Sequence, residues 1–597
     1  MFITGLTFIV NQTTAIVSTL FTYFMIIFAP FINYIATHYR PLAMVLVVLP
    51  LSFVLRNVMS FRDYLYTTFI ADATMEGHET RVERVINDLT TRLQRPAKER
   101  RFLCTARAPW QNLSTRFADY KKSSDCIFVG DFRNVLSLNP PKTKDGMYTV
   151  TLEPLVDVGM ATRWLLPHGY MLATTLEIEE ATIGGLACAV GMTTASHKYG
   201  LLQETVESYE IILGDGTRVH ATRTNKYSDL WHAFPWSHGS LGLLVGLTLQ
   251  IIPVQKYVQV TYTNCNGSIS KYSDSIRKAS LKDPLVVADF VEATVFSRTE
   301  CVLMEASFVP ESKVDSSQIN NVGWWFKKWF YTHVYDFCQT GGDDAIHIEY
   351  IPTYQYIFRH NRGIFWTLRD QLPEKYGNNI FFRYLLGWLN PPKVTFLKMP
   401  ATPEIKKEMM IQRVYQDIVL PLHTLEQAIE LAGDLFEIWP ILVYPSRIYD
   451  HNILNQNKNT ENKNTENMQG QFRCPRKEDL VKGTNYAMYY DLGVYGIPKQ
   501  VLENDPLYKP VTSMRIMEKF TSDHRGAPFL YANTFMNREE FGHMFDMELY
   551  EKMRIKYGAK QHFHHLYNKT AGCLSFDFEE MLKDEEMMGS EDGKKKK

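Results

Sequence analysis

The sequence predicts an α+β protein with an amino-terminal membrane anchor. Three observations support this prediction: strand-like and helical patterns alternate in the first half, long aromatic-rich stretches fill the second half, and an uncharged segment lies near the amino terminus. The chain has 597 residues, of which 45% are hydrophobic and 22% are charged, close to the averages for globular proteins. We therefore expect most of the chain to fold in water, as roughly two to four domains.

The membrane anchor is predicted from the 21 uncharged residues of Ala15–Ile35. At 1.5 Å per residue, a helix of this length crosses a hydrocarbon core of about 30 Å. A second apolar run, Leu42–Leu55, is short for a crossing and is interpreted as interfacial, although Pro30 and Pro50 leave room for a kinked or re-entrant path. A cleavable signal peptide is disfavoured, because no basic start and no Ala-x-Ala site accompany the run. Residues 1–56 are thus expected to form a single-pass anchor.

Charges near the two ends of the chain predict where the body lies. The carboxyl-terminal string EDGKKKK resembles the dilysine signal that returns membrane proteins to the endoplasmic reticulum, and a solvated charge run is the alternative. We expect the endoplasmic reticulum membrane, or the Golgi, with the catalytic part in the cytosol because basic residues cluster after the hydrophobic zone. These basic residues are Arg56, Arg62, Arg81, Arg84, Arg92, Arg95, Lys98, Arg100 and Arg101.

Charge balance and cysteine spacing exclude two classes of function. With 64 basic and 65 acidic residues the net charge is -1, whereas proteins that neutralise many phosphates carry a basic excess. Nucleic acid is therefore not expected as a partner. The eight cysteines form no Cys-x-x-Cys pair and no Cys/His ligand spacing, so they are interpreted as reduced core thiols and no metal site is predicted.

The first half reads as an amphipathic helix followed by short strands. Apolar residues recur at helical spacing between Glu79 and Arg101, which predicts a helix leading away from the membrane. The Asp215-Gly216 pair suits a two-residue hairpin turn, because Gly adopts positive φ without a Cβ clash. Strands are predicted in β-rich segments bounded by turn residues, at 127–131, 148–154, 207–222 and 244–253.

The residue composition of the chain changes from about Gln255 onward. Aromatic residues dominate 323–337 and 381–389, and a low-complexity insert at 455–471 is predicted to be a surface loop. The tail at 576–597 is acidic and then basic, and is expected to be disordered.

The most informative segment is TIGGLACAVGMTTASHKYG, which runs from Thr182 to Gly200. Small residues let the main chain approach a ligand closely, and free amides with hydroxyls suit the oxygens of a pyrophosphate. The pattern matches neither the Gly-x-Gly-x-x-Gly nor the Walker motif, and a close-packed turn is the alternative. The candidate cofactor-binding residues are Thr182, Ile183, Gly184, Gly185, Leu186, Ala187, Cys188, Ala189, Val190, Gly191, Met192, Thr193, Thr194, Ser196 and His197.

Three strings in order, GGLACAVGMTTASHKYG, ILGDGTRV and DLWHAFPWSHGSLGLLVGLTLQIIP, resemble the FAD-binding domain of the PCMH / vanillyl-alcohol-oxidase flavoproteins. The resemblance implies a PCMH-type two-subdomain FAD-binding domain at 57–255, followed by an α+β substrate (cap) domain at 256–575. It also implies that the glycine segment lies against the FAD diphosphate and that residues 104–114 form the first FAD-contacting loop. Gly239 and Gly242 correspond to the motif that packs a strand under the cofactor.

Covalent attachment of FAD is not expected. Relatives that bind FAD covalently often do so through a histidine in the first loop, but no histidine occurs from Glu79 to Pro167. We therefore expect non-covalent FAD, with His197 as a polar cofactor contact or a packing contact.

Further strings, SHKYGL, PWSHGSLG, EYIPTYQYIFRHNRGIFW, FRYLLGWLNPPK and YANTFMNREEF, resemble the Δ24-sterol reductases (24-dehydrocholesterol reductase, diminuto/seladin type). This resemblance covers nearly the whole chain. It implies NADPH-dependent, FAD-dependent reduction of the C24–C25 double bond of a desmosterol-like sterol to a cholesterol-like product. Other enzymes of sterol synthesis are implied as partners.

Reduction of an isolated alkene requires an acid. The double bond is not polarised, so protonation of C24 must place positive charge on C25, which then accepts hydride from flavin N5. No choice among the candidate acids follows from the sequence, since a core tyrosine or a solvated helix face explains each one equally well. The candidates are Tyr489, Tyr490, Asp491, Tyr531, Asn533, Asn537, Glu539 and Glu540.

Five tryptophans in the second half have three possible roles. They suit a sterol-lined cavity or an interfacial patch that meets the bilayer, and ordinary core packing is the alternative. These residues are Trp324, Trp325, Trp329, Trp366 and Trp388.

Two other functions stay open at this point. A flavin oxidase of the same fold would pass its electrons to oxygen, and a non-catalytic membrane scaffold would retain the fold without flavin. Fast reoxidation of the reduced protein in air would indicate the first, and colourless purified protein would indicate the second.

Overall fold

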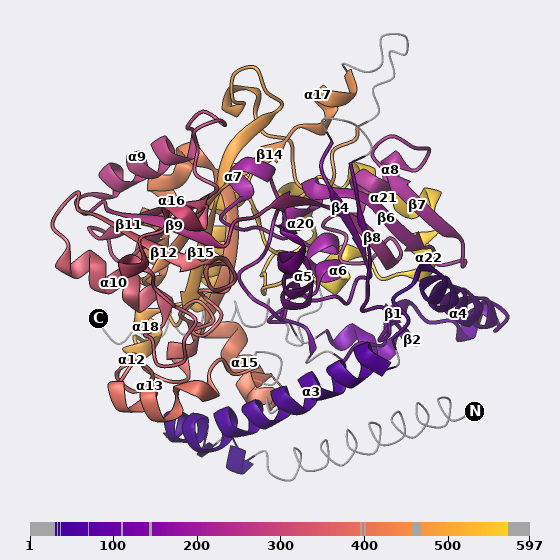
Figure 1. The fold of residues 1–597 in the computed structure, drawn as a ribbon. Coiled ribbons are helices and arrows are strands. Elements are labelled where there is room, and N and C mark those ends of the chain that lie inside the picture. Colours follow the sequence, from indigo (N-terminus) through magenta and orange to yellow (C-terminus); the bar gives the residue numbers. More distant parts are fainter. Residues whose placement is uncertain are drawn as a thin grey trace, which may run out of the picture.

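Two β-sheets form the body of the protein, one from each half of the chain (Figure 1). The predicted surface loop at 455–471 is largely outside the described residues, and the predicted tail at 576–597 is wholly outside them. The computed structural model describes residues 30–570 except 33, 36–37, 70, 109–110, 117, 142–145, 394–396, 399–401 and 457–466.

The first sheet has six strands in the order β3-β4-β8-β6-β7, with β5 paired to β8, and a separate parallel pair β1-β2 lies beside it. Its strands are β1 (Leu103–Thr105), β2 (Asp125–Ile127), β3 (Val135–Asn139), β4 (Thr149–Leu152), β5 (Tyr170–Leu172), β6 (Val206–Ile212), β7 (Arg218–Thr222) and β8 (Leu243–Pro253). The associated helices are α4 (Met75–Leu93), α5 (Val158–Leu165), α6 (Ile183–Cys188), α7 (Ser196–Tyr199) and α8 (Ser228–Ala233).

Helix α4 is the predicted amphipathic helix, but it begins and ends at other residues than the prediction gave. It begins after Thr74, whose hydroxyl accepts a hydrogen bond from the Gly77 amide at 3.1 Å, and it buries Val82, Val85 and Leu89. The prediction extended it to residue 101, but it ends at Leu93. Pro96 accounts for the difference, because proline disfavours helical backbone in the residue before it and cannot donate a helical hydrogen bond.

The hairpin between β6 and β7 also differs from the prediction. Leu213 N donates to Thr217 O at 2.9 Å, so three residues rather than two close the hairpin. Gly216 N donates to Leu213 O at 3.0 Å, and Gly216 adopts φ +88°. The loop is a turn followed by a residue in the left-handed conformation, which is the usual form of a three-residue hairpin loop. Its last residue, here Gly216, is favoured to be glycine.

The second sheet has eight strands in the order β12-β9-β11-β10-β14-β15-β13-β16. Its strands are β9 (Tyr257–Asn264), β10 (Phe290–Val295), β11 (Cys301–Val309), β12 (Ile346–Pro352), β13 (Val414–Pro421), β14 (Ile441–Tyr449), β15 (Tyr486–Gly496) and β16 (Ala527–Pro528). The helices of this half are α9 (Ile269–Ser280), α10 (Phe330–Thr340), α11 (Thr353–Ile357), α12 (Glu374–Gly377), α13 (Ile380–Leu386), α15 (Pro403–Ile411), α16 (Leu425–Phe436), α17 (His451–Gln456), α18 (Lys499–Leu502) and α19 (Pro510–Asp523).

Strand β15 presents alternate residues to the two faces of this sheet. Tyr490, Leu492 and Val494 pack in the apolar layer that α9, α16 and α19 cover. Because successive side chains of a strand point to opposite faces, Asp491 and Tyr495 lie on the other face, which is turned toward the first half of the chain.

The amino-terminal apolar run forms one long helix against the body. It comprises α2 (Arg40–Ala43), a π-helical turn (Met44–Val48) and α3 (Leu49–Phe69), so the predicted interfacial run Leu42–Leu55 is helical. In Figure 1 it lies along the underside of the molecule. The predicted span Ala15–Ile35 lies almost wholly outside the described residues.

The last described segment returns to the first half of the chain. Tyr550 of α21 lies with its hydroxyl 2.7 Å from the Ser240 hydroxyl, and Arg554 donates to Ser240 O at 2.9 Å. Lys569 of α23 donates to the His238 carbonyl. The two units are therefore closed by helices from the end of the chain, namely α20 (Arg538–Met544), α21 (Glu548–Lys556), α22 (Ala559–His562) and α23 (Leu566–Lys569).

The seven cysteines in the described part of the chain are free thiols. Cys126 is exposed rather than in the core, against the prediction. It lies on β2 directly beside Cys104 of β1, with 3.4 Å between the two sulfur atoms.

A buried ion pair in the second sheet gives a first prediction. Arg359 donates to Glu292 Oε2 from Nε at 3.1 Å, and His360 contacts the other carboxylate oxygen at 2.7 Å. Replacing Arg359 by Met removes the permanent positive charge beside Glu292 and leaves this buried carboxylate with His360 as its remaining partner. We expect a loss of about 3–5 kcal/mol in the free energy of unfolding, measured by urea denaturation. The control Arg298→Met breaks an exposed pair with Asp434 and should cost under about 1 kcal/mol; equal losses would contradict this account.

Glu518 of α19 gives a second prediction. Its carboxylate accepts a hydrogen bond from the Phe535 amide at 2.8 Å, and burial raises its pKa to about 8. The folded protein therefore holds this proton more tightly than the unfolded chain. The stability is largest below the unfolded pKa of about 4.5 and falls as pH rises toward 8.

Replacing Glu518 by Gln keeps the acceptor and removes the titration. We expect the variant to gain about 2–4 kcal/mol relative to the wild type between pH 5 and pH 8, measured as the difference in urea-unfolding free energies. Glu539→Gln, at an exposed position of α20, should show no such pH-dependent gain. A constant difference between the wild type and Glu518→Gln across this range would refute the assigned pKa.

Candidate cofactor and substrate site

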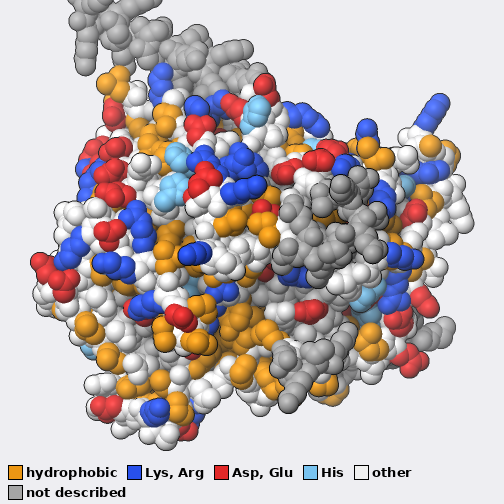
Figure 2. Space-filling model, turned by 90° about the horizontal axis from the view of Figure 1, so that it is seen from above, with side chains coloured by type: hydrophobic (Ala, Val, Ile, Leu, Met, Phe, Trp, Pro, Cys, Tyr) orange, Lys and Arg blue, Asp and Glu red, His pale blue; other side chains and the backbone are white. Residues whose placement is uncertain are grey.

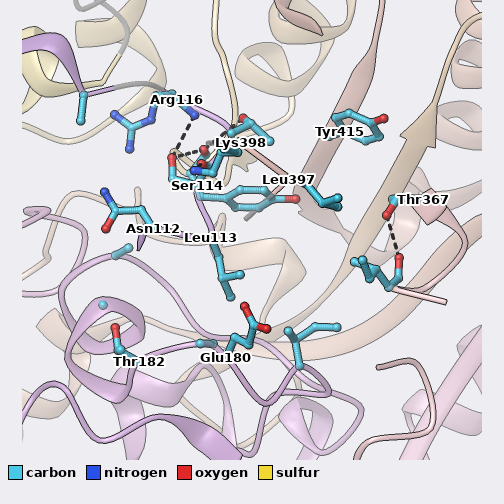
Figure 3. Close-up of a pocket in the computed structure, with 18 of the residues that line it drawn as sticks. Asn112, Leu113, Ser114, Arg116, Glu180, Thr182, Thr367, Leu397, Lys398 and Tyr415 are labelled. Atoms are coloured by element: carbon cyan, nitrogen blue, oxygen red, sulfur yellow. Dashed lines mark hydrogen bonds between the residues drawn. The ribbon is translucent and has the colours of Figure 1, made fainter. Parts of the chain in front are cut away.

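A cavity of about 1090 Å³ lies between the two units, and three parts of the chain line it. The glycine segment and the loop before it form one wall, the inner face of the second sheet forms another, and α3 with α15 closes the lower side. Figure 3 shows Asn112 and Ser114 of the first loop, and Arg116 just after it, facing Thr367 and Tyr415 from the second half.

The glycine segment splits between the cavity and the interior. Thr182 is the N-cap of α6, and the chain then turns so that eight of the fifteen predicted residues line the cavity. These eight are Thr182, Gly184, Gly185, Leu186, Cys188, Ala189, Val190 and Met192. The other seven, Ile183, Ala187, Gly191, Thr193, Thr194, Ser196 and His197, lie behind them and do not line it.

The residues behind this wall hold it in place. His197 lies with its ring nitrogens 3.0 Å from Thr194 O and 2.9 Å from Ala288 O, which makes it a packing contact. The Thr193 hydroxyl donates to Glu177 at 2.8 Å, and the Thr193 amide donates to Ser196 Oγ at 3.0 Å.

Three main-chain amides of residues that line the cavity make no hydrogen bond within the described part of the chain: those of Gly185, Val190 and Met192. Ile183 N and Gly184 N instead donate to the carbonyls of Val156 and Pro154, at 2.9 Å each. Unpaired amides on a short helix start and the turn after it bind anions.

Buried cations surround these amides, and sequence reasoning did not single them out. Arg107 donates to Thr182 Oγ1 at 3.1 Å, and burial lowers its pKa to about 10. Burial also lowers the pKa of Lys398 to about 7 and that of Lys569 to about 8, with neighbouring cations adding to both shifts. Lys398 donates to the Ser114 carbonyl, next to Arg116 (Figure 3).

Positive charge held away from bulk water favours an anionic ligand. The cations that line the cavity include Arg107, Arg116, Lys121, Lys398 and Lys569. Only Arg107 lies in the predicted first loop, 104–114. Lys398 and Lys569 come from distant parts of the second half and carried no local signal.

Two further glycines lie beside the cavity at positions where the backbone favours glycine. A Cβ on Gly242 would lie 2.3 Å from Ile211 Cγ2, so only Gly lets β8 approach β6 here. Gly239 adopts φ +67°, and a Cβ there would meet Lys569 Nζ at 3.9 Å. Both glycines line the cavity.

Several side chains that line the cavity have a buried polar atom with no hydrogen-bond partner in the described part of the chain. Among these atoms are Glu177 Oε2, His238 Nε2, Tyr444 Oη and Asp491 Oδ1. Buried polar atoms are almost always hydrogen-bonded in folded proteins. Together with the open amides and the cations, they fit a large ligand that carries a diphosphate at one end and a polar ring system at the other, as FAD does.

An acid cluster lies on the inner face of the second sheet. Asp417 of β13 and Asp491 of β15 are diagonal neighbours across the strand pair, and their carboxyls hydrogen-bond to each other. Tyr531 donates to Asp417 Oδ2 at 2.8 Å, and Tyr495 donates to the other oxygen. All four residues line the cavity.

The proton of this pair belongs on Asp491. Burial raises the pKa of Asp417 to about 6, while its two tyrosine donors act in the opposite direction. Burial and the neighbouring Asp417 raise the pKa of Asp491 well above its usual value. Two tyrosine hydroxyls stabilise a charged Asp417, whereas burial and the Asp417 charge outweigh the single Ile418 amide at Asp491, so Asp491 is the neutral acid at pH 7.

The other predicted acids lie elsewhere. Tyr490 is behind the sheet with its hydroxyl 3.1 Å from Thr424, and Tyr489 is a core residue beside Phe472. Asn537 and Glu540 form the capping box of α20, and Glu539 is exposed on that helix. Asn533 does not line the cavity. Of the eight candidates, only Asp491 and Tyr531 reach it.

The five tryptophans divide between core and surface. Trp329 and Trp366 are fully buried, whereas Trp324, Trp325 and Trp388 are about half exposed. None of them lines the cavity, so they are core residues and a surface patch rather than a sterol-lined wall.

Comparison with known proteins agrees with this geometry. A family model described as "FAD binding domain" matches residues 95–222, which include the glycine segment. The Delta(24)-sterol reductase of Pisum sativum is 35% identical over 540 residues, 89% of this chain and 91% of that protein. The protein of the same name from Arabidopsis thaliana is 35% identical over 539 residues, 89% of this chain and 91% of that protein. The Homo sapiens Delta(24)-sterol reductase is 32% identical over 540 residues, 90% of this chain and 94% of its own length.

Proposed function

The chain belongs to the Delta(24)-sterol reductase family, and from this membership we propose that Asp491 protonates the Δ24 double bond of a sterol held in the cavity. The protein is an FAD-dependent oxidoreductase that acts on a sterol. Neither a flavin oxidase nor a non-catalytic scaffold gains support from the site or from the relatives. The observation that carries the proposal is a neutral buried acid on the wall opposite the cofactor-binding segment.

In this proposal FAD is held without a covalent bond. The amides of Gly185, Val190 and Met192 donate to its diphosphate, and Arg107 and Lys398 compensate the charge. The remaining members of the predicted set, such as Thr193 and His197, position this wall from behind.

Bound FAD supplies the hydride that NADPH provides. The chain's own contribution is the proton: Asp491 gives it to C24, so its O–H bond breaks, a C24–H bond forms and C25 becomes a tertiary cation that the hydride then neutralises. The new Asp491 carboxylate remains close to this positive charge. Tyr495 and Tyr531 hold Asp417 in place beside it.

The cavity walls near the acid exclude water from the cation. Phe365, Leu442 and Phe529 line this region, and the latter two are buried. Aromatic faces also stabilise positive charge. A dry, apolar site is needed because water would trap the cation as an alcohol.

The test uses microsomes that contain the full-length protein, NADPH deuterated at its transferable position, and a sterol with a Δ24 double bond. We expect the product to gain two hydrogens, with the deuterium at C25. In D₂O with unlabelled NADPH, the deuterium should appear at C24 instead. No gain of mass refutes the sterol assignment, and deuterium from NADPH at C24 refutes the proposed roles of the two hydrogens.

The pH dependence of turnover supplies a third prediction. A proton donor must be protonated, so kcat should be constant at low and neutral pH and fall on the alkaline side. In Asp417→Asn the neighbouring negative charge that raises the Asp491 pKa is gone, so the alkaline limb should move to lower pH. Tyr490→Phe, on the other face of β15, should leave the profile unchanged. If kcat of Asp417→Asn falls at the same alkaline pH as kcat of the wild type, Asp491 is not the donor.

The same proposal includes the use of NADPH and contact with other enzymes of sterol synthesis. It also includes single-pass insertion in the endoplasmic reticulum or Golgi membrane, with the catalytic part in the cytosol. The basic residues after the hydrophobic zone and the terminal lysines support the location and the orientation. Protease treatment of sealed microsomes is expected to degrade the body of the protein. Protection of the body would place it in the lumen.

A further inference from the structure

The long amino-terminal helix is tied to the body along its whole length. Arg40 pairs with Glu408 of α15 at 3.0 Å at one end, and Asp63 pairs with Arg133 at 2.8 Å near the other. Between them, Arg56 donates to Pro391 O at 2.9 Å. The 27 residues Arg40–Tyr66 measure about 40 Å at 1.5 Å per residue, so these contacts fix a helix that lies along the surface of the body.

The middle of the helix adds two further contacts. The Ser52 hydroxyl accepts from the Lys393 amide at 2.7 Å, and the Phe53 ring packs edge-on against Trp388 at 4.7 Å between centroids. Standing this helix across a bilayer would break all of these contacts, because the body cannot follow it into the hydrocarbon.

The outer side of the same helix is apolar, and the described part of the chain leaves it largely exposed. The segment Arg40–Tyr66 has a mean hydropathy of 2.1 in its most apolar window, and only 17% of that window is buried. Its exposed apolar and aromatic residues are Leu42, Leu46, Val47, Leu51, Val54, Val58, Phe61, Tyr64 and Leu65.

Helix α13 and the loop at 324–325 extend this apolar surface beside α3. Phe53 of α3 touches Trp388, just after α13, and Tyr384 of α13 stacks on Phe326 at 5.3 Å. The exposed residues of this second part are Trp324, Trp325, Ile380, Phe381, Tyr384, Leu385 and Trp388. We name the two groups together the apolar platform. The face seen in Figure 2, from above and thus away from α3, instead mixes acidic and basic side chains.

The cavity reaches the surface at the platform. Val47 and Leu51 line the cavity, yet they are 58% and 54% exposed. One helical turn apart, they mark the rim of an opening between α3 and the body. Ile405 and Met409 of α15 line the cavity on the other side.

We propose that the apolar platform lies flat in one leaflet of a phospholipid bilayer and that the sterol enters the cavity from that leaflet past Val47 and Leu51. Two features of the platform indicate that its partner is a lipid bilayer. The platform combines a long apolar helix with exposed Trp and Tyr side chains, which favour the interface between headgroups and acyl chains. Its extent exceeds what a soluble monomer leaves uncovered. The portal part of the proposal rests on the proposed function, since it needs a sterol substrate.

The orientation is tested by placing an environment-sensitive fluorescent amino acid in the full-length protein in vesicles of phosphatidylcholine and phosphatidylserine. Lipids brominated at graded depths quench the probe. Positions Leu46, Val54 and Phe61 should report one shared, shallow depth, and Leu385 should be quenched as well. Ile555, equally exposed at 69% against 70% for Leu385, should not be quenched. A profile in which Val54 is deepest while Leu385 is unquenched indicates a spanning helix and overturns the proposal.

The portal is tested by narrowing its rim with Val47→Trp and Leu51→Trp. We expect the apparent KM, expressed as mole fraction of sterol in the bilayer, to rise at least 5-fold, while the rate at which NADPH reduces bound flavin without sterol stays unchanged. Ile555→Trp is the control. An unaltered KM in both rim variants overturns the portal. If the wild-type protein turns over no sterol at all, the proposed function fails instead, and the quenching profile still decides the orientation.

Discussion

Asp491→Asn is expected to lower kcat for sterol reduction by roughly 10²- to 10⁴-fold, the usual contribution of general acid catalysis. The amide keeps the shape of the side chain but cannot give a proton to C24. Because Asp491 contacts Asp417 and not the cofactor-binding segment, the variant should retain its flavin and its rate of flavin reduction by NADPH. Single-turnover mass analysis of sterol, together with the flavin absorbance spectrum, measures both effects.

Two controls make this result specific. Asp491→Asn removes a buried acid, so a change in folding is monitored by thermal unfolding, and we expect an equal or higher Tm. Tyr490→Phe alters the adjacent residue on the opposite face of β15, where its hydroxyl meets Thr424, and should change kcat less than twofold. Wild-type kcat in Asp491→Asn would assign the proton to another group, with Tyr531 as the remaining candidate on the cavity wall.

Gly185→Leu is expected to abolish retention of FAD during purification. A Cβ at this position meets only Thr182 Oγ1, at 2.9 Å, so the side chain enters the cavity and covers the open amides. Losing about two charge-assisted hydrogen bonds costs roughly 3 kcal/mol or more, which is at least a hundredfold in Kd. The measurements are the flavin-to-protein absorbance ratio and the rise in Tm on adding FAD, which should disappear.

The neighbouring glycine is a poorer probe of the same question. A Cβ on Gly184 would lie 2.3 Å from Pro154 Cβ, so a larger residue there disturbs packing whether or not a cofactor binds. Gly342→Leu is the matched control for Gly185→Leu, since a Cβ at Gly342 has no neighbour within 4 Å. Normal flavin content in Gly185→Leu would remove the basis for locating the diphosphate here.

Local patterns in the sequence were sufficient for part of this site. Small residues around Gly185 indicated close approach of a ligand, and the β6–β7 hairpin and β8 followed from strand patterns. The capping box of Asn537 and Glu540 was also visible as a residue pair three positions apart. Recognising it would have removed both residues from the list of acids.

The rest depended on contacts between distant residues. Asp417 and Tyr531 are 114 residues apart, and Ser114 and Tyr531 are 417 apart. No local period reveals such pairs. In β15 nearly every residue is buried on both faces, so the alternation that would have separated Asp491 from Tyr490 is absent from the sequence.

Closure of the first unit by the end of the chain has a consequence for biosynthesis. Lys569 and its neighbours complete the wall beside Gly239, although the family-model match ends at residue 222. A nascent chain that has been synthesised only to residue 222 lacks one side of the flavin pocket. Cofactor binding therefore requires the helices at the end of the described chain, and we expect a chain that stops before α21 to contain every strand of both sheets and yet to retain no flavin.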